Sequence, residues 1–161
     1  GARLHPRYDI VMQYLNLADL MARVDLVMTA EGSLDEQTPY GKIPAEVARR
    51  AKQHGLPVIA LAGTLGKGAA KNLEHGIDAY ASIMQCPCSL EEAIAKAGRL
   101  LVKATEEVMR MVRVGAQLAP RETRRGVRPS GQHARWARFP LRAPRNKRTH
   151  APTRLATVGA Y

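Results

Sequence analysis

Cysteine, aromatic residues and long apolar runs are all scarce in this chain. Only two of its 161 residues are cysteine, Cys86 and Cys88 in the tripeptide Cys-Pro-Cys, and aromatic residues make up 4%. A structural zinc site usually takes four ligands, and no second Cys or His pair stands at matching spacing, so we expect two free thiols in a reducing cytoplasm. No run approaches the ~20 apolar residues that cross a bilayer, and no signal segment is present, so we expect no membrane partner.

Acidic residues are scarce at one end of the chain. Residues 120–161 hold 11 of the 25 Lys and Arg residues but one of the 14 acids, so +10 of the formal charge of +11 belongs to this segment. The segment lacks any hydrophobic period, and its composition cannot offset an ordering entropy of about 1–2 kcal/mol per residue. We therefore predict a disordered or non-native basic tail over residues 119–161. Nucleic-acid binding through this charge is the alternative, although two interleaved aromatics are too few for a stacking platform.

The rest of the chain, residues 1–118, alternates between helical and extended patterns. Helical periods cover four segments: residues 9–22, 44–54, 69–75 and 89–115. Strands are predicted at three apolar runs: residues 25–29, 57–62 and 79–84. The last helix begins with a capping box at Ser89, and the second strand has no polar alternation, which is typical of a strand buried on both faces of a parallel sheet. This order favours an α/β fold with helices packed on a parallel sheet.

The first strand leads into a segment with two acids and a lysine, Glu31, Asp35 and Lys42. In an open parallel sheet, ligands bind at the carboxyl ends of the strands. Carboxylates there suit Mg²⁺, which prefers hard oxygen ligands, or suit proton abstraction from an attacking hydroxyl. Neutral groups suited to a small polyhydroxy substrate lie between them: Ser33, Gln37 and Thr38. A polar loop whose acids face water or cap the next helix is the alternative, and the residues alone favour neither.

The second strand leads into a glycine-rich segment at residues 63–68, Gly-Thr-Leu-Gly-Lys-Gly. Glycines let backbone N–H groups approach an anion, and the following helix presents its positive end. Four residues are therefore candidates for binding a nucleotide phosphate: Gly63, Thr64, Gly66 and Lys67. The segment is not a Walker A loop, because Leu61 and Gly68 stand where glycine and Ser or Thr are needed. A short glycine-rich turn is by itself a weak signal, and the residues alone favour an ordinary strand-to-helix turn over a phosphate site.

Several ordered blocks resemble one enzyme family. Residues 25–38 read D-L-V-M-T-A-E-G-S-L-D-E-Q-T, and residues 41–48 read G-K-I-P-A-E-V-A. Further blocks follow in order at residues 57–63, 76–79 and 87–93. Together these blocks resemble the C-terminal part of the bacterial glycerate kinase family, whose corresponding motifs are D-L-V-I-T-[GA]-E-G-x-x-D-x-Q-T and G-K-x-P-x-x-V-A. The resemblance covers roughly residues 1–118.

The resemblance implies an ATP-dependent, Mg²⁺-requiring kinase that phosphorylates D-glycerate to 2-phosphoglycerate, or to 3-phosphoglycerate. It implies two α/β domains, one of them a Rossmann-like three-layer domain, with the active site between them. It assigns the catalytic acids and metal ligands to two residues: Glu31 and Asp35. It assigns the substrate pocket to five more: Thr29, Gly32, Ser33, Gln37 and Lys42. Lys42 would pair with phosphate charge.

Two departures from the family pattern stand out. Ala30 occupies a position at which many members have glycine, and the family's N-terminal motifs and middle domain have no counterpart in this chain. We therefore expect an incomplete Rossmann-like domain that needs the missing N-terminal part of the enzyme as its partner and is inactive alone. An open sheet edge would favour a homodimer or aggregation. A Rossmann-like module that binds a nucleotide or metabolite without chemistry is the competing hypothesis.

Overall fold

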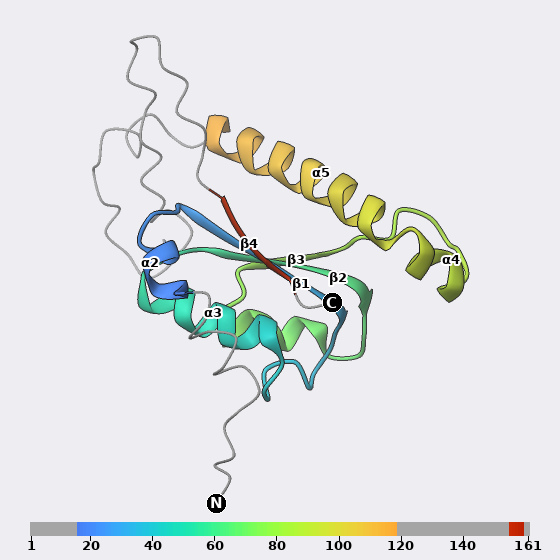
Figure 1. The fold of residues 1–161 in the computed structure, drawn as a ribbon, viewed down its shortest axis with the longest axis horizontal. Coiled ribbons are helices and arrows are strands. Elements are labelled where there is room, and N and C mark those ends of the chain that lie inside the picture. Colours follow the sequence, from blue (N-terminus) through green and yellow to red (C-terminus); the bar gives the residue numbers. More distant parts are fainter. Residues whose placement is uncertain (1–15, 119–154, 160–161) are drawn as a thin grey trace, which may run out of the picture. The chain divides into compact units, whose positions relative to one another are not determined.

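The computed structural model describes residues 16–118 and 155–159 (Figure 1). Four strands form one sheet in the order β3-β2-β1-β4, and every neighbouring pair is parallel. The strands are β1 (Leu26–Leu34), β2 (Val58–Leu65), β3 (Ala79–Ser82) and β4 (Leu155–Gly159). The helical elements are α2 (Leu17–Met21), α3 (Ile43–Gln53), the 3₁₀ helix η1 (Ala69–His75), α4 (Leu90–Ala95) and α5 (Ala97–Leu118). The predicted α/β fold with a parallel sheet is confirmed.

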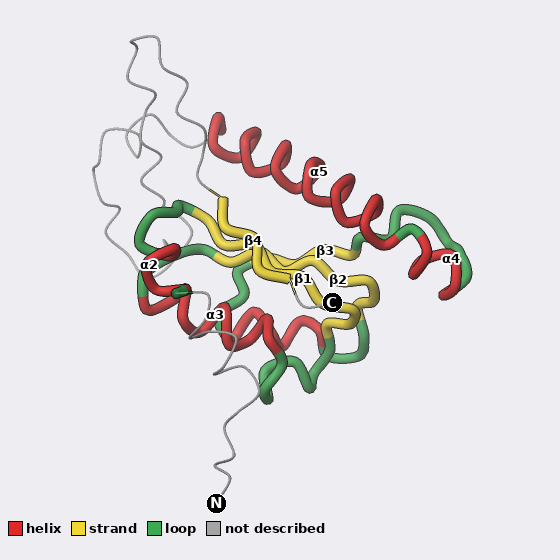
Figure 2. The backbone as a smooth tube through the Cα atoms, viewed as in Figure 1, coloured by secondary structure: helices red, strands yellow, loops and turns green. Residues whose placement is uncertain are grey.

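Helix α3 packs on one face of the sheet (Figure 2). Its inward side chains recur at helical spacing at Val47, Ala48 and Ala51, and all three are fully buried. They meet alternate residues of β2, including Val58 and Ala60, in one hydrophobic core. Side chains on the opposite face of the strands are buried as well: Met28 and Leu61. The expectation of a strand buried on both faces is therefore confirmed for β2.

Strands β1 and β2 run further than the sequence indicated. The pairing continues past the predicted strand ends to Ser33–Thr64 and Leu34–Leu65. Neither extension is apolar, so neither reads as a strand in isolation, but each supplies hydrogen-bonding partners for the other's backbone. Glu31, Gly32, Gly63 and Thr64 therefore lie within strands and not in turns.

The remaining predicted elements are confirmed with adjusted ends. Helix α3 begins one residue before Pro44, η1 has the predicted bounds as a 3₁₀ helix, and β3 is two residues shorter than expected. The single long helix is wrong: α4 and α5 are separated at Lys96, and α5 continues through Gly115. Ser89 caps α4 as predicted, because its Oγ accepts a hydrogen bond from Glu92 N at 3.1 Å. Residues 9–15 of the first predicted helix lie outside the described residues.

Strand β4 was not predicted, because residues 155–159 belong to the segment expected to be disordered. These residues read Leu-Ala-Thr-Val-Gly and carry no charge, unlike the Arg-rich sequence before them. They pair with β1 from Leu26–Leu155 to Ala30–Gly159. The edge of β1, which we expected to be open, is therefore occupied by the chain itself. The rest of the predicted tail, residues 119–154 and 160–161, lies outside the described residues.

The chain divides into two compact units. The first comprises residues 1–105 and 152–161 and holds the sheet, α2, α3, η1 and α4. The second comprises residues 106–151, and its described part is the end of α5, residues 106–118, where Val108 is buried and Met111 and Val114 are exposed. Among the described residues, no helix has the length and apolar content that a membrane crossing requires.

Candidate functional site

The segments that follow β1 and β2 along the chain, which we call the two strand exits, meet at one edge of the sheet. Because β1 and β2 are parallel and end in register at Leu34 and Leu65, the segments that follow them start side by side. Gly66 N donates to Leu34 O at 2.8 Å, and Glu36 N donates to Lys67 O at 3.0 Å. The turn between β1 and α3 is thus hydrogen-bonded to the turn between β2 and η1.

Asp35 is the centre of the hydrogen bonds in the first turn. Its Oδ1 accepts bonds from Gln37 N at 2.9 Å and from Thr38 Oγ1 at 3.2 Å, and its own N–H donates to Thr38 Oγ1 at 3.0 Å. Its Oδ2 accepts a bond from Lys42 Nζ at 2.8 Å. The bond from Lys42 is the largest of the causes that lower the pKa of Asp35 below its usual value, with Gln37 N acting in the same direction. Asp35 is therefore a carboxylate with both oxygens engaged.

Lys42 stands immediately before α3 and reaches back to the end of β1. Besides Asp35, its Nζ donates to Ser33 O at 3.3 Å. Both members of the Lys42–Asp35 pair are 26% exposed. A lysine ammonium carries three N–H donors, so one donor remains beyond these two bonds. The structure thus brings Asp35, Ser33 and Lys42 together, and their role in binding stays a prediction.

Glu31 lies apart from that cluster. It pairs with Ala62 inside the sheet, and its Oε1 accepts a bond from Gly32 N at 3.2 Å. It forms no ion pair with any residue that the structure describes. At about 3.3 Å per residue, four residues of extended chain separate its Cα from that of Asp35 by up to about 13 Å. The structure records no contact between the two predicted catalytic acids among the described residues.

The described residues could bind Mg²⁺ through one carboxylate at a time, and not through a cluster of side chains. Among residues 16–118 and 155–159, no group of three or more His, Cys, Asp or Glu side chains is arranged to hold a metal ion. Mg²⁺ keeps several waters and is usually bound through one or two carboxylates together with substrate phosphates. Glu31 fits that kind of contact better than Asp35, whose oxygens already accept bonds from Lys42 and the turn.

The other residues expected to contact substrate differ in their exposure to solvent. Thr29 is 1% exposed, and its Oγ1 is buried without a hydrogen-bond partner in the described structure. Gly32 and Gln37 are exposed, and Ser33 is half-buried. Thr29 therefore lies in the core of the sheet, while the other three reach the edge at which the strands end.

The glycines of the second exit serve close packing. A Cβ added to Gly63 would lie 2.8 Å from Gly32 O, and one added to Gly66 would lie 3.1 Å from Asp35 Cβ. Gly68 has φ +72°, and a Cβ there would lie 2.7 Å from Glu36 Cβ. The N–H of Gly66 is used within the protein, whereas Lys67 and Thr64 are exposed. These observations explain the glycines without an anion, so their phosphate role stays a prediction.

Two buried polar residues hold the site together: Thr38, which the sequence offered as a group for a polyhydroxy substrate, and Asn72, which had no role in the sequence interpretation. Thr38 is fully buried and bonded to Asp35, and Asn72 on η1 is 1% exposed with its side chain bonded to Asp35 O. No pattern marks Asn72, because a polar residue in a short helix ordinarily faces water.

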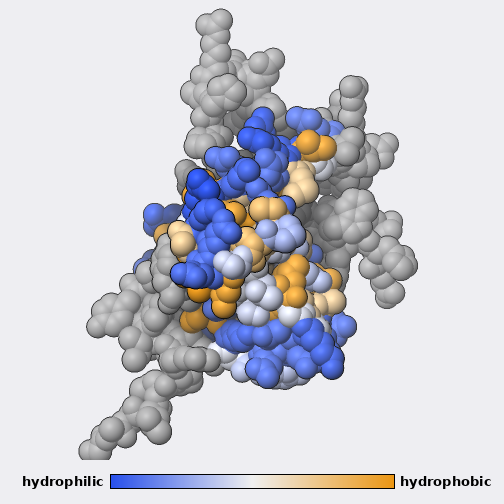
Figure 3. Space-filling model, turned by 90° about the vertical axis from the view of Figure 1, so that its right-hand side faces the viewer, coloured by the Kyte–Doolittle hydropathy of each residue, from blue (hydrophilic) through white to orange (hydrophobic). Residues whose placement is uncertain are grey.

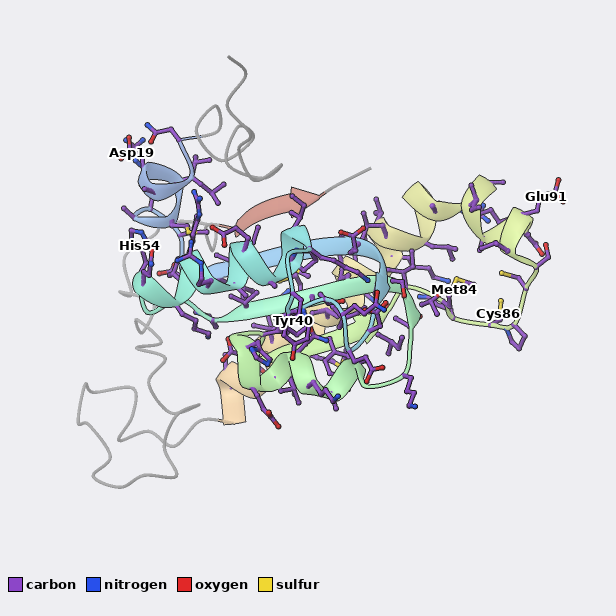
Figure 4. The ribbon with its side chains drawn as sticks, turned by 90° about the horizontal axis from the view of Figure 1, so that it is seen from below. Asp19, Tyr40, His54, Met84, Cys86 and Glu91 are labelled. Carbon is purple, nitrogen blue, oxygen red and sulfur yellow. The ribbon has the colours of Figure 1, made fainter. Side chains whose placement is uncertain are left out.

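Other side chains with titratable or ring groups lie elsewhere or on the surface. Figure 4 shows His54 at the far end of α3 and Cys86 in the loop after β3, whereas Tyr40 lies in the turn before α3. The rings of Tyr40 and His75 are tilted to each other with centroids 6.3 Å apart. Cys86 and Cys88 are both free and exposed, as expected. The face drawn in Figure 3 is largely hydrophilic, with hydrophobic residues between in small groups.

Comparisons with known proteins point to one family. Residues 1–113 match the model of the glycerate kinase family. A glycerate kinase from Halalkalibacterium halodurans is 45% identical over 107 residues, 66% of this chain and 28% of that protein. The glycerate 2-kinase of Escherichia coli K12 is 34% identical over 119 residues, 74% of this chain and 31% of that protein.

A solved structure agrees with the sequence relatives. The crystal structure of a Salmonella typhimurium LT2 protein assigned as glycerate kinase 2 aligns with a TM-score of 0.55 at 37% identity. The alignment covers 73% of this chain and 30% of that one. The chain thus spans under a third of the length of the relatives described here.

Proposed function

Because this chain belongs to the glycerate kinase family, we propose that it supplies part of the active site of an ATP-dependent kinase for D-glycerate. The junction of the two strand exits carries the proposal: Leu34 and Glu36, on either side of Asp35, are hydrogen-bonded to Gly66 and Lys67, so the Asp35–Lys42 pair lies beside the Gly66–Gly68 turn. Ligands of open parallel sheets bind at this edge. A charged pair beside a backbone turn suits a substrate with a carboxylate, hydroxyls and a nearby phosphate.

Phosphoryl transfer depends mainly on positioning and on neutralising charge. Lys42 is held by Asp35 and Ser33, and its third N–H is the donor available to an anionic oxygen of substrate or nucleotide. Asp35 orients this ammonium. Its own carboxylate, stabilised in the ionised form, is a weak proton acceptor.

Glu31 takes the remaining acidic role. Its carboxylate forms no ion pair in the described structure, so it is the one free to accept the proton of the attacking hydroxyl or to contact Mg²⁺. Bound Mg²⁺ would neutralise phosphate charge, and ATP would supply the phosphoryl group. Gln37 and Ser33 lie at the same edge and suit the hydroxyls of glycerate.

The product we propose is 2-phosphoglycerate. The similar protein from Escherichia coli carries the name glycerate 2-kinase, and this name supports the proposal. We further propose that residues beyond this chain complete the site, since the relatives are more than three times as long as the matched part. The 161-residue chain alone is then inactive, or nearly so.

A chimaera tests these assignments. The matched segment of the Escherichia coli relative is replaced by residues 1–118, and ADP release is followed with D-glycerate and Mg·ATP. Glu31→Gln should lower kcat by about 10²–10⁴-fold, the range for loss of a general base. Lys52→Met is the control, because Lys52 bonds to Leu56 O and Asp78, away from this edge.

Two results would contradict the proposal. A chimaera that folds and keeps its activity after Glu31→Gln would remove Glu31 from the chemistry. Turnover at ordinary kinase rates by the isolated 161-residue chain would show that no further segment is needed.

A further inference from the structure

Asn72 is a buried polar residue placed between the two strand exits. It is 1% exposed, and its Nδ2 donates to Asp35 O and to Ala69 O, both at 2.9 Å. Its Oδ1 is buried and has no hydrogen-bond partner among the described residues. A buried acceptor without a partner destabilises the fold, so the presence of asparagine here needs a reason.

The orientation of the amide follows from its neighbours. Both atoms close to Nδ2 are carbonyl oxygens, which accept and cannot donate. A flipped amide would place Oδ1 against both of them, so the observed orientation is the one that satisfies the network. Position 72 therefore requires a side chain with two protons to donate. Aspartate has the same shape but offers none when ionised, and leucine has a similar volume but no polar atom.

The bond to Asp35 is one of three that fix the backbone of residues 34–36 to the second exit; the exposed ion pair between Lys71 Nζ and Glu36 Oε2, at 3.1 Å, also joins the two segments. Leu34 O accepts from Gly66 N, Asp35 O accepts from Asn72 Nδ2, and Glu36 N donates to Lys67 O. The backbone of three consecutive residues is thus fixed to the segment 66–72. The middle bond is the one made by a side chain, so it can be removed without changing the backbone.

We propose that Asn72 is a positioning residue that fixes the Asp35 turn to the Gly66–Gly68 turn, so that both exits bind one ligand together. This inference rests on the proposed function. Without the amide, Asp35 O loses its donor, and the Asp35 turn is held to the segment 66–72 by the two flanking backbone bonds and the exposed Lys71–Glu36 pair. The Asp35–Lys42 pair is then held less firmly at its distance from the backbone of Gly66–Gly68, and a ligand that contacts both segments loses affinity.

The first test measures amide hydrogen exchange by NMR in the full 161-residue chain. Asn72→Leu should speed exchange at Glu36 and Gly66 by about tenfold, the effect of losing one buried hydrogen bond. Asn72→Asp should speed exchange at these two amides more than Asn72→Leu does, although aspartate is closer in shape to asparagine. If Asn72→Asp fails to fold while Asn72→Leu folds, that is the same result in stronger form. The control is Val58→Ala, which truncates the core near the start of β2 and should not single out these two amides.

The second test titrates each variant with Mg·ADP. In the unaltered chain the amides of Asp35 and of residues 66–68 should shift with one common dissociation constant. Asn72→Leu should weaken that constant about tenfold and separate the two sets of shifts, whereas Val58→Ala should keep them together. If Asn72 only stabilised the fold, Asn72→Leu and Val58→Ala would change the dissociation constant for Mg·ADP in the same way, and both would keep the two sets of shifts together.

The outcomes distinguish Mg·ADP binding by this chain from the role of Asn72. If the unaltered chain does not bind Mg·ADP, residues beyond this chain are needed for nucleotide binding, and the exchange rates decide whether Asn72 joins the two turns. Unchanged exchange at Glu36 and Gly66 in Asn72→Leu, or an Asn72→Asp variant as stable as Asn72→Leu, would overturn the role of Asn72.

Discussion

Replacing Gly63 with alanine should destabilise the fold through a contact between two backbones. The added Cβ would lie 2.8 Å from the carbonyl oxygen of Gly32 on the neighbouring strand. Carbon–oxygen contacts between strands normally measure about 3.3–3.6 Å, so β1 and β2 must separate by about 0.5 Å or more at this point. The obstructing atom is backbone and cannot rotate away. An overpacked position of this kind costs about 1–3 kcal/mol.

Gly32 provides a matched control on the facing strand. A Cβ added there meets no atom within 4 Å, and Gly32 is not among the glycines with positive φ. Gly32→Ala should therefore range from neutral to stabilising by about 1 kcal/mol, because alanine restricts the unfolded chain. The same substitution at two neighbouring positions is thus predicted to have opposite signs.

Thermal unfolding followed by far-UV circular dichroism measures the difference. For a domain of about 100 residues, 1 kcal/mol corresponds to about 4–8 °C in Tm, so Gly63→Ala should unfold at least about 4 °C below Gly32→Ala. Urea unfolding with unchanged m would show that the stability itself has changed. Equal Tm values for the two variants would refute the close approach of the strands, and with it the packing explanation for this glycine.

Three further predictions use the same chain. Glu46 is buried and accepts a hydrogen bond from Arg49 Nε at 2.9 Å, which lowers its pKa below the usual 4.5. Its contribution to the free energy of unfolding should therefore be complete above pH 4.5 and lost as pH falls through the lower pKa of the folded state. Urea unfolding of the unaltered chain and of Glu46→Gln at pH 3–7 checks this, and a stability difference that does not change with pH would contradict it. Lys42→Met should change the free energy of unfolding by less than about 1 kcal/mol, since its ion pair is partly exposed; a larger loss would make Lys42 a structural residue. Truncation before Leu155 should uncover β1 and produce concentration-dependent association by light scattering, and a monomer would contradict this.

The starts of β1, β2, β3, α3 and η1 could be predicted from the sequence to within one residue, but the ends of the central strands could not. Helix α3 follows from apolar residues at helical spacing after Pro44, and the start of β2 follows from an uninterrupted apolar run. The last residues of β1 and β2 include glycine and polar side chains, which read as turns. They are extended because each strand pairs with the other, and pairing between distant segments leaves no local pattern.

The same limit applies to the candidate site. The sequence predicted Asp35 and Lys42 as site residues, and in the structure Asp35 Oδ2 and Lys42 Nζ lie 2.8 Å apart. The bonds that fix them come from Thr38, four residues from Lys42 along the chain, and from Asn72, which is 37 residues from Asp35. The first contact lies within one turn and is accessible to motif reasoning. The second depends on which side of η1 faces inward, and that is settled by tertiary packing.

The extension of β1 also separates the roles of the two acids. A strand that ended at Thr29 would leave Glu31 and Asp35 in one turn, free to converge on a single ion. The observed strand carries Glu31 within the sheet and leaves Asp35 beyond its end, up to about 13 Å away. Asp35 then meets Lys42 and becomes the counterion of an ammonium, while Glu31 keeps an unpaired carboxylate among the described residues. The division that we propose, with Asp35 as positioning acid and Glu31 as reactive acid, would thus follow from where the strand ends.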